Sequence, residues 1–244
     1  MAEKVKRISL SVVIPAFNEE QRLKESLLRI ISFLKRQKGT SEILVVDDGS
    51  TDRTATVAKS ASPLVKVLSV PENRGKGHAV RAGMLAAKGM RILFSDADLS
   101  TPIEDLALLE RHLKSHDIVI GSRNLSGSMV ETKQPWYRQL AGKLFSLFTR
   151  IVILPGIKDT QCGFKLFSKS AARVIFSRAR LDGFAFDVEA LYLARKLKYR
   201  IAEVPVHWYN SPQSKVRMFA DPFKMALSIF GIYGNDLFGR YRKR

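Results

Sequence analysis

The stretch LSVVIPAFNEEQRLKESLLRIISFLKRQKGTSEILVVDD, residues 10–48, contains an apolar run, a helical pattern and a second apolar run. Residues 10–16 are apolar apart from Ser11 and rich in β-branched side chains, as expected of a strand that is covered on both faces. Residues 18–37 repeat apolar positions every three or four residues, with Asn18 as a candidate N-cap, so they predict an amphipathic helix. Residues 42–48 are the second strand. This order predicts two parallel strands joined by a right-handed crossover.

The same alternation continues along the first half of the chain. Further strands are expected at 64–70, 91–96 and 117–123, with helical patterns between them. After about residue 125 the alternation fades, but no linker rich in Pro, Gly or Ser and no internal repeat appears. We therefore expect an α/β protein with a mostly parallel sheet flanked by helices, in a single domain over residues 1–244.

The chain is strongly basic for its length of 244 residues. Lys and Arg total 41 against 23 Asp and Glu, which gives a formal net charge of +18. Such a charge attracts polyanions: nucleic acid, anionic lipid or phosphorylated small molecules. Because no helix carries a basic stripe and no aromatic–basic RNA motif appears, nucleic acid is not an expected partner. The single cysteine, Cys162, excludes an intrachain disulfide.

Polar residues follow the end of each expected strand. In sheets of this kind, ligands bind beyond the carboxyl ends of the strands. Five separate loops therefore place polar groups on one rim: Asn18 and Glu19, Asp47 and Asp48, residues 73–76, Asp96 and Asp98, and Arg123. This coincidence predicts a binding site along that rim.

Asp96 and Asp98 are the most informative of these residues. In an extended segment, residues i and i+2 point the same way, so the two carboxylates face one point. Two carboxylates aimed at one point repel each other unless a cation lies between them. Mg²⁺ and Mn²⁺ prefer oxygen ligands and often share them with substrate phosphates. The alternative is a loop with two solvated acids.

Two other loops, after the second and third expected strands, could bind a ligand or could simply be turns. Asp47 or Asp48 can accept a hydrogen bond from a base or a ribose hydroxyl, but DDGS is also an ordinary turn with caps. Gly75 and Gly77 precede a helix and form a candidate anion-binding loop. Their spacing matches neither GxGxxG nor GxxxxGK[ST], which argues against a nicotinamide cofactor or a P-loop.

Four motifs in order, VVIPAFNEE, VVDDGSTDRT, NRGKGHAVRAG and SDADLSTP, resemble the inverting GT-A glycosyltransferases of family 2. GSRN, DTQCGFKLFSK and FAFDVEALYLA narrow the resemblance to the members that transfer a hexose to a polyprenyl phosphate. The resemblance implies UDP-glucose as the nucleotide sugar, a dolichyl-type polyprenyl phosphate as the acceptor and Mg²⁺ or Mn²⁺ as cofactor. GDP-mannose as the donor, or a glycan as the acceptor, remains the alternative.

The resemblance also implies roles for individual residues. Asp96, Asp98, Arg123 and Asp187 would be catalytic, and Asp98 and Asp96 would bind the metal. Ser100 stands where some relatives carry a third ligand, a glutamine. The nucleotide sugar would contact Pro15, Ala16, Asn18, Glu19, Asp47, Asp48, Lys76 and Asp96. The acceptor phosphate would contact Arg123, Arg138, Gln161, Lys215 and Arg217.

The expected organisation follows from these roles. Residues 8–125 would form the nucleotide-sugar half, residues 126–217 the acceptor half and residues 218–244 an amphipathic helix with a basic tail. The apolar segments 144–157 and 222–234 would lie on a membrane surface, with core-facing helices as the alternative. With no signal-peptide pattern and no apolar run of about 20 residues, we expect a peripheral protein on the cytoplasmic face of a membrane.

Overall fold

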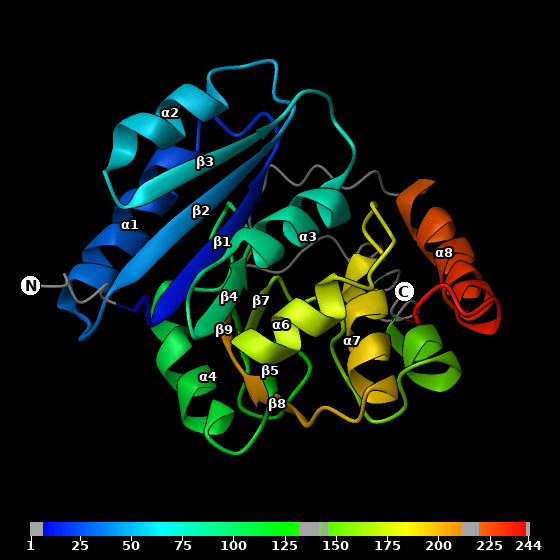
Figure 1. Cartoon of the computed structure of the whole chain (residues 1–244). Coiled ribbons are helices and arrows are strands. Elements are labelled where there is room, and N and C mark those ends of the chain that lie inside the picture. The colour runs from blue at the N-terminus through cyan, green and yellow to red at the C-terminus, as the bar shows by residue number, and fades with distance from the viewer. Residues whose placement is uncertain (1–6, 132–141, 143–145, 211–219, 243–244) are drawn as a thin grey trace, which may run out of the picture.

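The computed structural model describes residues 7–131, 142, 146–210 and 220–242, and in 220–226 only the helical backbone. Its centre is a seven-stranded sheet (Figure 1). The strands, in their order across the sheet, are β3 (Val65–Val70), β2 (Ser41–Asp48), β1 (Leu10–Ala16), β4 (Arg91–Ser95), β7 (Phe164–Ser168), β5 (Ile118–Ser122) and β8 (Ile201–Pro205). Neighbouring strands pair in parallel except at β7, which is antiparallel to both β4 and β5. A second, two-stranded sheet pairs β6 (Met129–Glu131) with β9 (His207–Tyr209).

Helices cover both faces of the sheet. The helices are α1 (Leu23–Arg36), α2 (Thr54–Ala61), α3 (Lys76–Ala86), the 3₁₀ helix η1 (Ile103–Asp105) with α4 (Leu106–Leu113), α6 (Lys169–Phe176), α7 (Phe186–Lys196) and α8 (Ala220–Leu237). Residues 146–152 are also helical. One apolar cluster joins α3, α6 and α7 to the sheet, and a second joins α1, η1 and α4 to it.

The strand β1 shows why the apolar runs are continuous. Val13 belongs to the cluster beneath α3, whereas Val12 and Ile14 belong to the cluster beneath α1, and all three are fully buried. Successive side chains of a strand point to opposite faces, so a strand covered on both sides needs apolar residues at every position. The predicted fold class is confirmed.

Three local expectations were wrong. Helix α1 begins at Leu23 with Arg22 as its N-cap, and Asn18 lies outside it with a left-handed φ of 52°. Residues 200–208, RIAEVPVHW, are also predicted from the sequence as one strand, but they are divided between β8 and β9, which belong to different sheets. No strand was expected at 164–168, where β7 lies.

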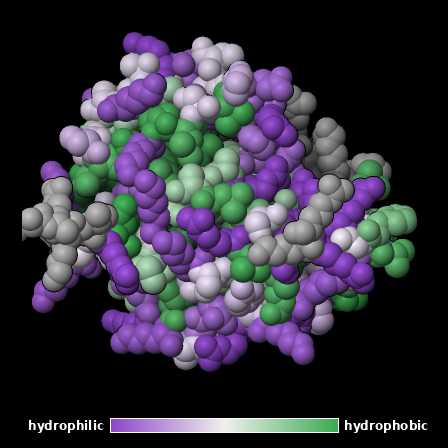
Figure 2. Space-filling view, viewed as in Figure 1, coloured by the Kyte–Doolittle hydropathy of each residue, from purple (hydrophilic) through white to green (hydrophobic). Residues whose placement is uncertain are grey.

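Apolar side chains gather at the right-hand edge of Figure 2, the side on which Figure 1 places α8. Exposed apolar side chains of the helical segment 146–152, of α8 and of the turn after it include Leu147, Ile151, Leu227, Phe230, Leu237 and Phe238. Among the described residues, no helix is both long enough and apolar enough to cross a bilayer.

Candidate active site

The rim predicted from the sequence exists at one edge of the large sheet. β1, β2 and β4 end there with Ala16, Asp48 and Ser95. Because β7 runs the other way, it contributes its beginning to the same edge: Ser95 pairs with Phe164. The Asp96 amide then donates to the Gly163 carbonyl at 3.0 Å. Residues 159–163, far away in sequence, therefore lie beside residues 96–98, the loop with the sequence DAD (the DAD loop).

Asp96 is fixed by a cation and by a glycine. The Lys76 ammonium, from the first residue of α3, lies 2.7 Å from Asp96 Oδ1. The Asp96 carboxylate occupies the space where a side chain at position 163 would stand: a Cβ on Gly163 would meet Asp96 Oδ2 at 1.9 Å. Gly163 is therefore required for this position of Asp96.

Asp98 lies in the same loop as Asp96, and its carboxylate is destabilised by burial and by the negative charge of Asp96. Its Oδ1 accepts the Ser100 amide at 3.0 Å, and its Oδ2 lies 3.5 Å from Arg22 Nη1. Burial, and then the negative charge of Asp96, raise the pKa of Asp98. Leu99, between these contacts, has a positive φ of 46°, a strained conformation for a residue with a branched side chain.

The two carboxylates suit a divalent cation. Their donor atoms are all oxygens, and their mutual repulsion is what such an ion would relieve. Within the described part of the chain, no group of three or more His, Cys, Asp or Glu residues could hold a metal ion. Mg²⁺ commonly binds one or two carboxylates and completes its shell with water and substrate phosphate, so a pair fits this chemistry.

The loops after β1 and β2 are tied to each other. The Thr51 backbone amide donates to Asn18 Oδ1 at 2.8 Å, and the Asn18 backbone amide donates to Ser50 Oγ at 2.9 Å. The Glu19 amide donates to Thr54 Oγ1 at 2.7 Å. The two loops therefore form one wall of the rim.

Other expected nucleotide-site residues support this wall. Pro15 and Ala16 are buried at the end of β1, and the Glu19 carboxylate binds Arg22. Asp47 Oδ1 accepts the Ser50 amide at 3.1 Å. The structure thus brings these residues to the rim.

Asp48 organises the loop before α3. Its Oδ2 accepts the Gly75 amide at 2.7 Å, and its Oδ1 accepts the Arg74 amide at 3.3 Å. The amides of Gly77 and His78 both donate to the Asp182 carbonyl, at 2.7 and 3.2 Å. The expectation of an anion-binding loop was wrong, because protein oxygens already occupy these amides.

Asp187 lies in the first turn of α7, close enough for its charge to act on Lys76 and Asp96. Its Oδ1 is 2.6 Å from the ammonium of Lys165, which also donates to the Cys162 carbonyl at 2.6 Å. Lys165 is 1% and Asp187 is 5% exposed. Burial raises the pKa of Asp187, and the charges of Lys165 and Lys76 oppose that shift.

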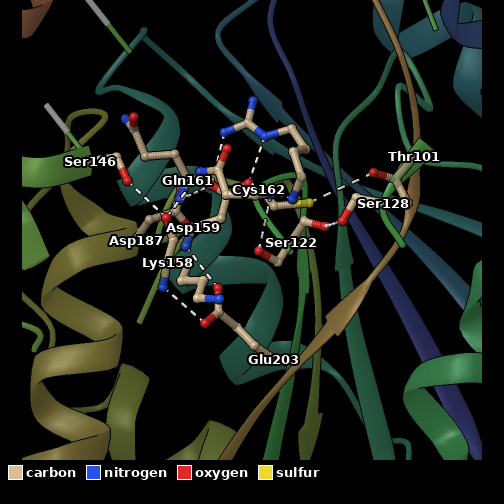
Figure 3. Close-up of polar contacts among 12 residues, drawn as sticks. Thr101, Ser122, Ser128, Ser146, Lys158, Asp159, Gln161, Cys162, Asp187 and Glu203 are labelled. Carbon is tan, nitrogen blue, oxygen red and sulfur yellow. Dashed lines mark hydrogen bonds and ion pairs between the residues drawn. The ribbon is translucent and has the colours of Figure 1, made fainter. Parts of the chain in front are cut away.

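Arg123 is held by a bidentate ion pair with Asp159, which is labelled in Figure 3. Its Nε and Nη2 donate to Oδ2 and Oδ1 of Asp159 at 2.7 and 2.9 Å, and its guanidinium lies 5.5 Å from the Trp208 ring centre. The Arg123 cation lowers the pKa of the buried Asp159 to about 2. The Asp159 carboxylate also accepts a hydrogen bond from the Gln161 backbone amide at 3.2 Å. The Glu203 carboxylate accepts one from the Asp159 backbone amide at 2.8 Å. The structure thus brings Arg123 and Gln161 together.

Not every expected acceptor residue can be placed. Arg138, Lys215 and Arg217 lie outside the described residues. Cys162 is buried, and burial raises the pKa of its thiol to about 11, so it stays protonated near neutral pH and is no nucleophile.

Three residues of the site were missed by sequence reasoning. Arg22 lies beside Asp98, Asp159 binds Arg123, and Gly163 makes room for Asp96. Arg22 stands three residues after Glu19, a spacing that allows an ion pair and is the only local signal among the three. Asp159 and Gly163 act on partners 36 and 67 positions away, which no local pattern indicates.

Comparison with known proteins assigns the chain to a family. Residues 11–176 match the family described as glycosyl transferase family 2. The chain belongs to this family. It is 40% identical to the Drosophila melanogaster dolichyl-phosphate beta-glucosyltransferase, over 96% of this chain and 77% of that protein. It is 38% identical to the human dolichyl-phosphate beta-glucosyltransferase, with the same two shares covered. The family expected from the motifs is confirmed, and the chain is a glycosyltransferase.

Solved structures share the fold of this chain. Glucosyl-3-phosphoglycerate synthase of M. tuberculosis superposes with a TM-score of 0.69 at 21% identity, covering 93% of this chain and 81% of that one. Mannosyl-3-phosphoglycerate synthase of Rubrobacter xylanophilus superposes with a TM-score of 0.69 at 19% identity, covering 97% of this chain and 76% of that one. The family 2 chain therefore has the GT-A fold. A complex of the mycobacterial enzyme contains Mn²⁺, UDP and glucosyl-3-phosphoglycerate. It superposes with a TM-score of 0.66 at 21% identity, covering 93% of this chain and 80% of that one.

Replacing Gly163 by alanine should lower transferase activity by about 100-fold or more. The new Cβ would force the Asp96 carboxylate to move, and a displacement of about 1 Å can reduce a rate by this factor. Initial rates and circular dichroism would be measured together. Gly231→Ala is the control, because a Cβ there meets nothing within 4 Å. Equal rates for both variants would contradict the role of Gly163.

Proposed function

We propose that this glycosyltransferase moves glucose from UDP-glucose to a dolichyl-type polyprenyl phosphate with inversion at the sugar carbon. The relatives' names supply the acceptor and the β product. UDP-glucose carries its sugar in α linkage, so a β product requires inversion. The observation that carries the proposal is the pairing of Asp96 with Lys76 beside Asp98, at one sheet edge, with the buried Asp187 near enough to act on Lys76.

The donor would lie between the DAD loop and the loops after β1, β2 and β3. Asp98 and Asp96 would hold Mg²⁺ or Mn²⁺, which when bound neutralises charge on the diphosphate. Asp48 and Lys76 would contact the nucleoside, with Asp47, Asn18, Glu19, Pro15 and Ala16 forming the wall behind it. The Lys76 cation is well placed to stabilise negative charge, since its pKa is raised by Asp96 and Asp187 despite burial.

The acceptor needs positioning more than a strong base. A phosphate monoester has a second pKa of about 6, so its oxygen is already anionic near neutral pH. That oxygen would form the new bond to the sugar carbon as the bond to UDP breaks. Arg123, Gln161, Arg138, Lys215 and Arg217 would bind the acceptor phosphate, and Asp187 would help to shape the acceptor site.

The proposed division of the chain follows these roles. Residues 8–125 bind the nucleotide sugar, residues 126–217 bind the acceptor, and residues 218–244 lie on the membrane that holds the lipid. The donor is tested by incubating the purified protein with dolichyl phosphate and labelled UDP-glucose or GDP-mannose in parallel, with and without Mn²⁺. Label from UDP-glucose should enter the lipid fraction only with the metal. Label from GDP-mannose instead would overturn the proposed donor.

The membrane contact is expected to depend on the exposed apolar residues of α8 and the segment after it. Changing Leu237 and Phe238 to serine together should strongly reduce sedimentation with anionic liposomes at low salt, because their side chains are 84% and 73% exposed. Leu28→Ser, at a half-exposed position on α1, is the matched control. Equal sedimentation of parent and double variant would refute this surface.

A further inference from the structure

We propose that Tyr241 and Glu189 are positioning residues for the loop 73–78, which the proposed function places at the nucleotide sugar. Neither residue touches that loop. They hold the segment 180–183 in place, and that segment packs against the loop. The inference rests on the proposed donor site for its functional consequence but not for its structural basis.

The first step joins the end of the chain to α7. Tyr241 is 3% exposed, and its hydroxyl donates to Glu189 Oε1 at 2.7 Å. Glu189 is fully buried in the first turn of α7. Its other oxygen, Oε2, accepts the backbone amides of Arg180 and Leu181, each at 2.9 Å. A buried carboxylate is costly without such donors, so its three partners fix one another's positions.

A second contact binds the same two segments. The Arg180 guanidinium donates twice to the Arg240 carbonyl, from Nε at 3.2 Å and from Nη2 at 3.0 Å. Residues 240–241 are therefore attached to residues 180–181 both directly and through Glu189.

The next step joins segment 180–183 to the loop 73–78. The Asp182 carbonyl accepts the amides of Gly77 and His78, and its carboxylate binds Arg81 at 2.5 Å. The two backbones also touch. A Cβ on Gly77 would lie 2.4 Å from the Leu181 carbonyl oxygen, and one on Gly75 would lie 2.5 Å from that of Asp182. With no space between them, a displacement of 180–183 must move the loop.

The last step reaches the donor side of the site. Within the loop, the Gly75 amide binds Asp48 and the Lys76 ammonium binds Asp96. Both acids are candidate donor residues. Asp187, by contrast, has its direct ion pair with Lys165, which lies on β7. Loosening the contact at Tyr241 should therefore weaken donor binding more than it slows the chemical step.

The test compares two tyrosines of one cluster. Tyr241→Phe removes the hydroxyl that binds Glu189. Tyr192→Phe is the matched control, because its hydroxyl donates instead to Asp236 of α8, at 2.5 Å, and its ring lies 6.4 Å from that of Tyr241. Hydrogen exchange of the Gly77 and His78 amides, measured without substrate, should accelerate about 5-fold or more in Tyr241→Phe and remain unchanged in Tyr192→Phe.

Steady-state kinetics of the same variants supply the functional readout. In Tyr241→Phe the KM for UDP-glucose should rise about 3- to 10-fold with kcat within about 2-fold, and Tyr192→Phe should match the parent. Glu189→Gln, which retains an acceptor for the two amides, should lie nearer the parent than Glu189→Ala. Thermal unfolding of every variant controls for simple loss of stability.

Three outcomes would separate this inference from the proposed function. Unchanged exchange in Tyr241→Phe overturns the inference, whichever sugar the enzyme uses. Accelerated exchange with an unchanged donor KM overturns it too, because the loop would then not govern donor binding. If the parent uses another nucleotide sugar, the proposed donor fails, and the same KM increase measured with that sugar supports the inference.

Discussion

Replacing Asp98 by asparagine should lower kcat/KM by about 10³-fold, the upper end of what one preorganised electrostatic group contributes, while leaving the protein folded. Asparagine keeps the shape and one oxygen but removes the charge that would bind a divalent cation. The same variant should lose Mn²⁺-dependent binding of UDP, which calorimetry measures without any turnover. Binding of UDP in the absence of metal should change little.

The stability of this variant should move in the opposite direction to its activity. The pKa of Asp98 is raised by burial and by Asp96, so the native state holds the Asp98 proton more tightly than the unfolded chain does. Ionisation of Asp98 therefore destabilises the native state as the pH rises from the ordinary aspartate pKa through the raised one. Asparagine does not ionise. The variant should thus unfold at a higher temperature than the parent at pH 7 without metal, and the difference should shrink in acid.

Asp117→Asn is the control for both measurements. Asp117 lies just before β5, at the opposite end of the strand from the site, and accepts the Arg200 amide at 2.9 Å. This variant should keep its activity and gain no stability. An Asp98→Asn protein that still transfers sugar, or that is less stable than the parent at neutral pH, would contradict the assignment.

The parts of the fold that the sequence predicted are those in which one segment determines its own structure. The strands β1, β2 and β4 are continuous apolar runs, and their burial on both faces allows few other conformations. β7 could not be found in this way. Its sequence FKLFS has a lysine at its second position, and its place between β4 and β5 depends on pairing with strands more than 40 residues away.

The same distinction holds for the site. The location of Asp48, Asp96 and Asp98 at one edge of the sheet could be predicted, because each ends or follows a recognisable strand and such ends meet there. The glycines before α3 suggested an anion site, but Asp182, more than 100 positions away, supplies the oxygen instead. Contacts between distant segments have no local pattern, so Gly163 and the Glu189–Tyr241 pair required the structure.

Replacing Lys165 by methionine should destabilise the protein by about 3–5 kcal/mol, the usual effect of removing one partner from a buried ion pair. Asp187 would then remain buried without the cation that lies 2.6 Å away, and Lys76 is already paired with Asp96. Denaturant unfolding measures the loss. Arg29→Met is the control: the Arg29–Glu104 pair has a similar 2.9 Å separation, but its two side chains are 49% and 45% exposed, so about 0–1 kcal/mol is expected.

The double change of Lys165 to methionine and Asp187 to leucine distinguishes a structural role of the pair from a catalytic one. Removing both charges leaves no unpaired ion, and apolar replacements of buried pairs are often neutral, so most of the lost stability should return. The Cys162 carbonyl would still lose its donor, at a cost of about 1 kcal/mol. If Asp187 works on the acceptor, this stable double variant stays inactive. If the pair only supports the fold, activity returns together with stability, and the acceptor role of Asp187 is refuted.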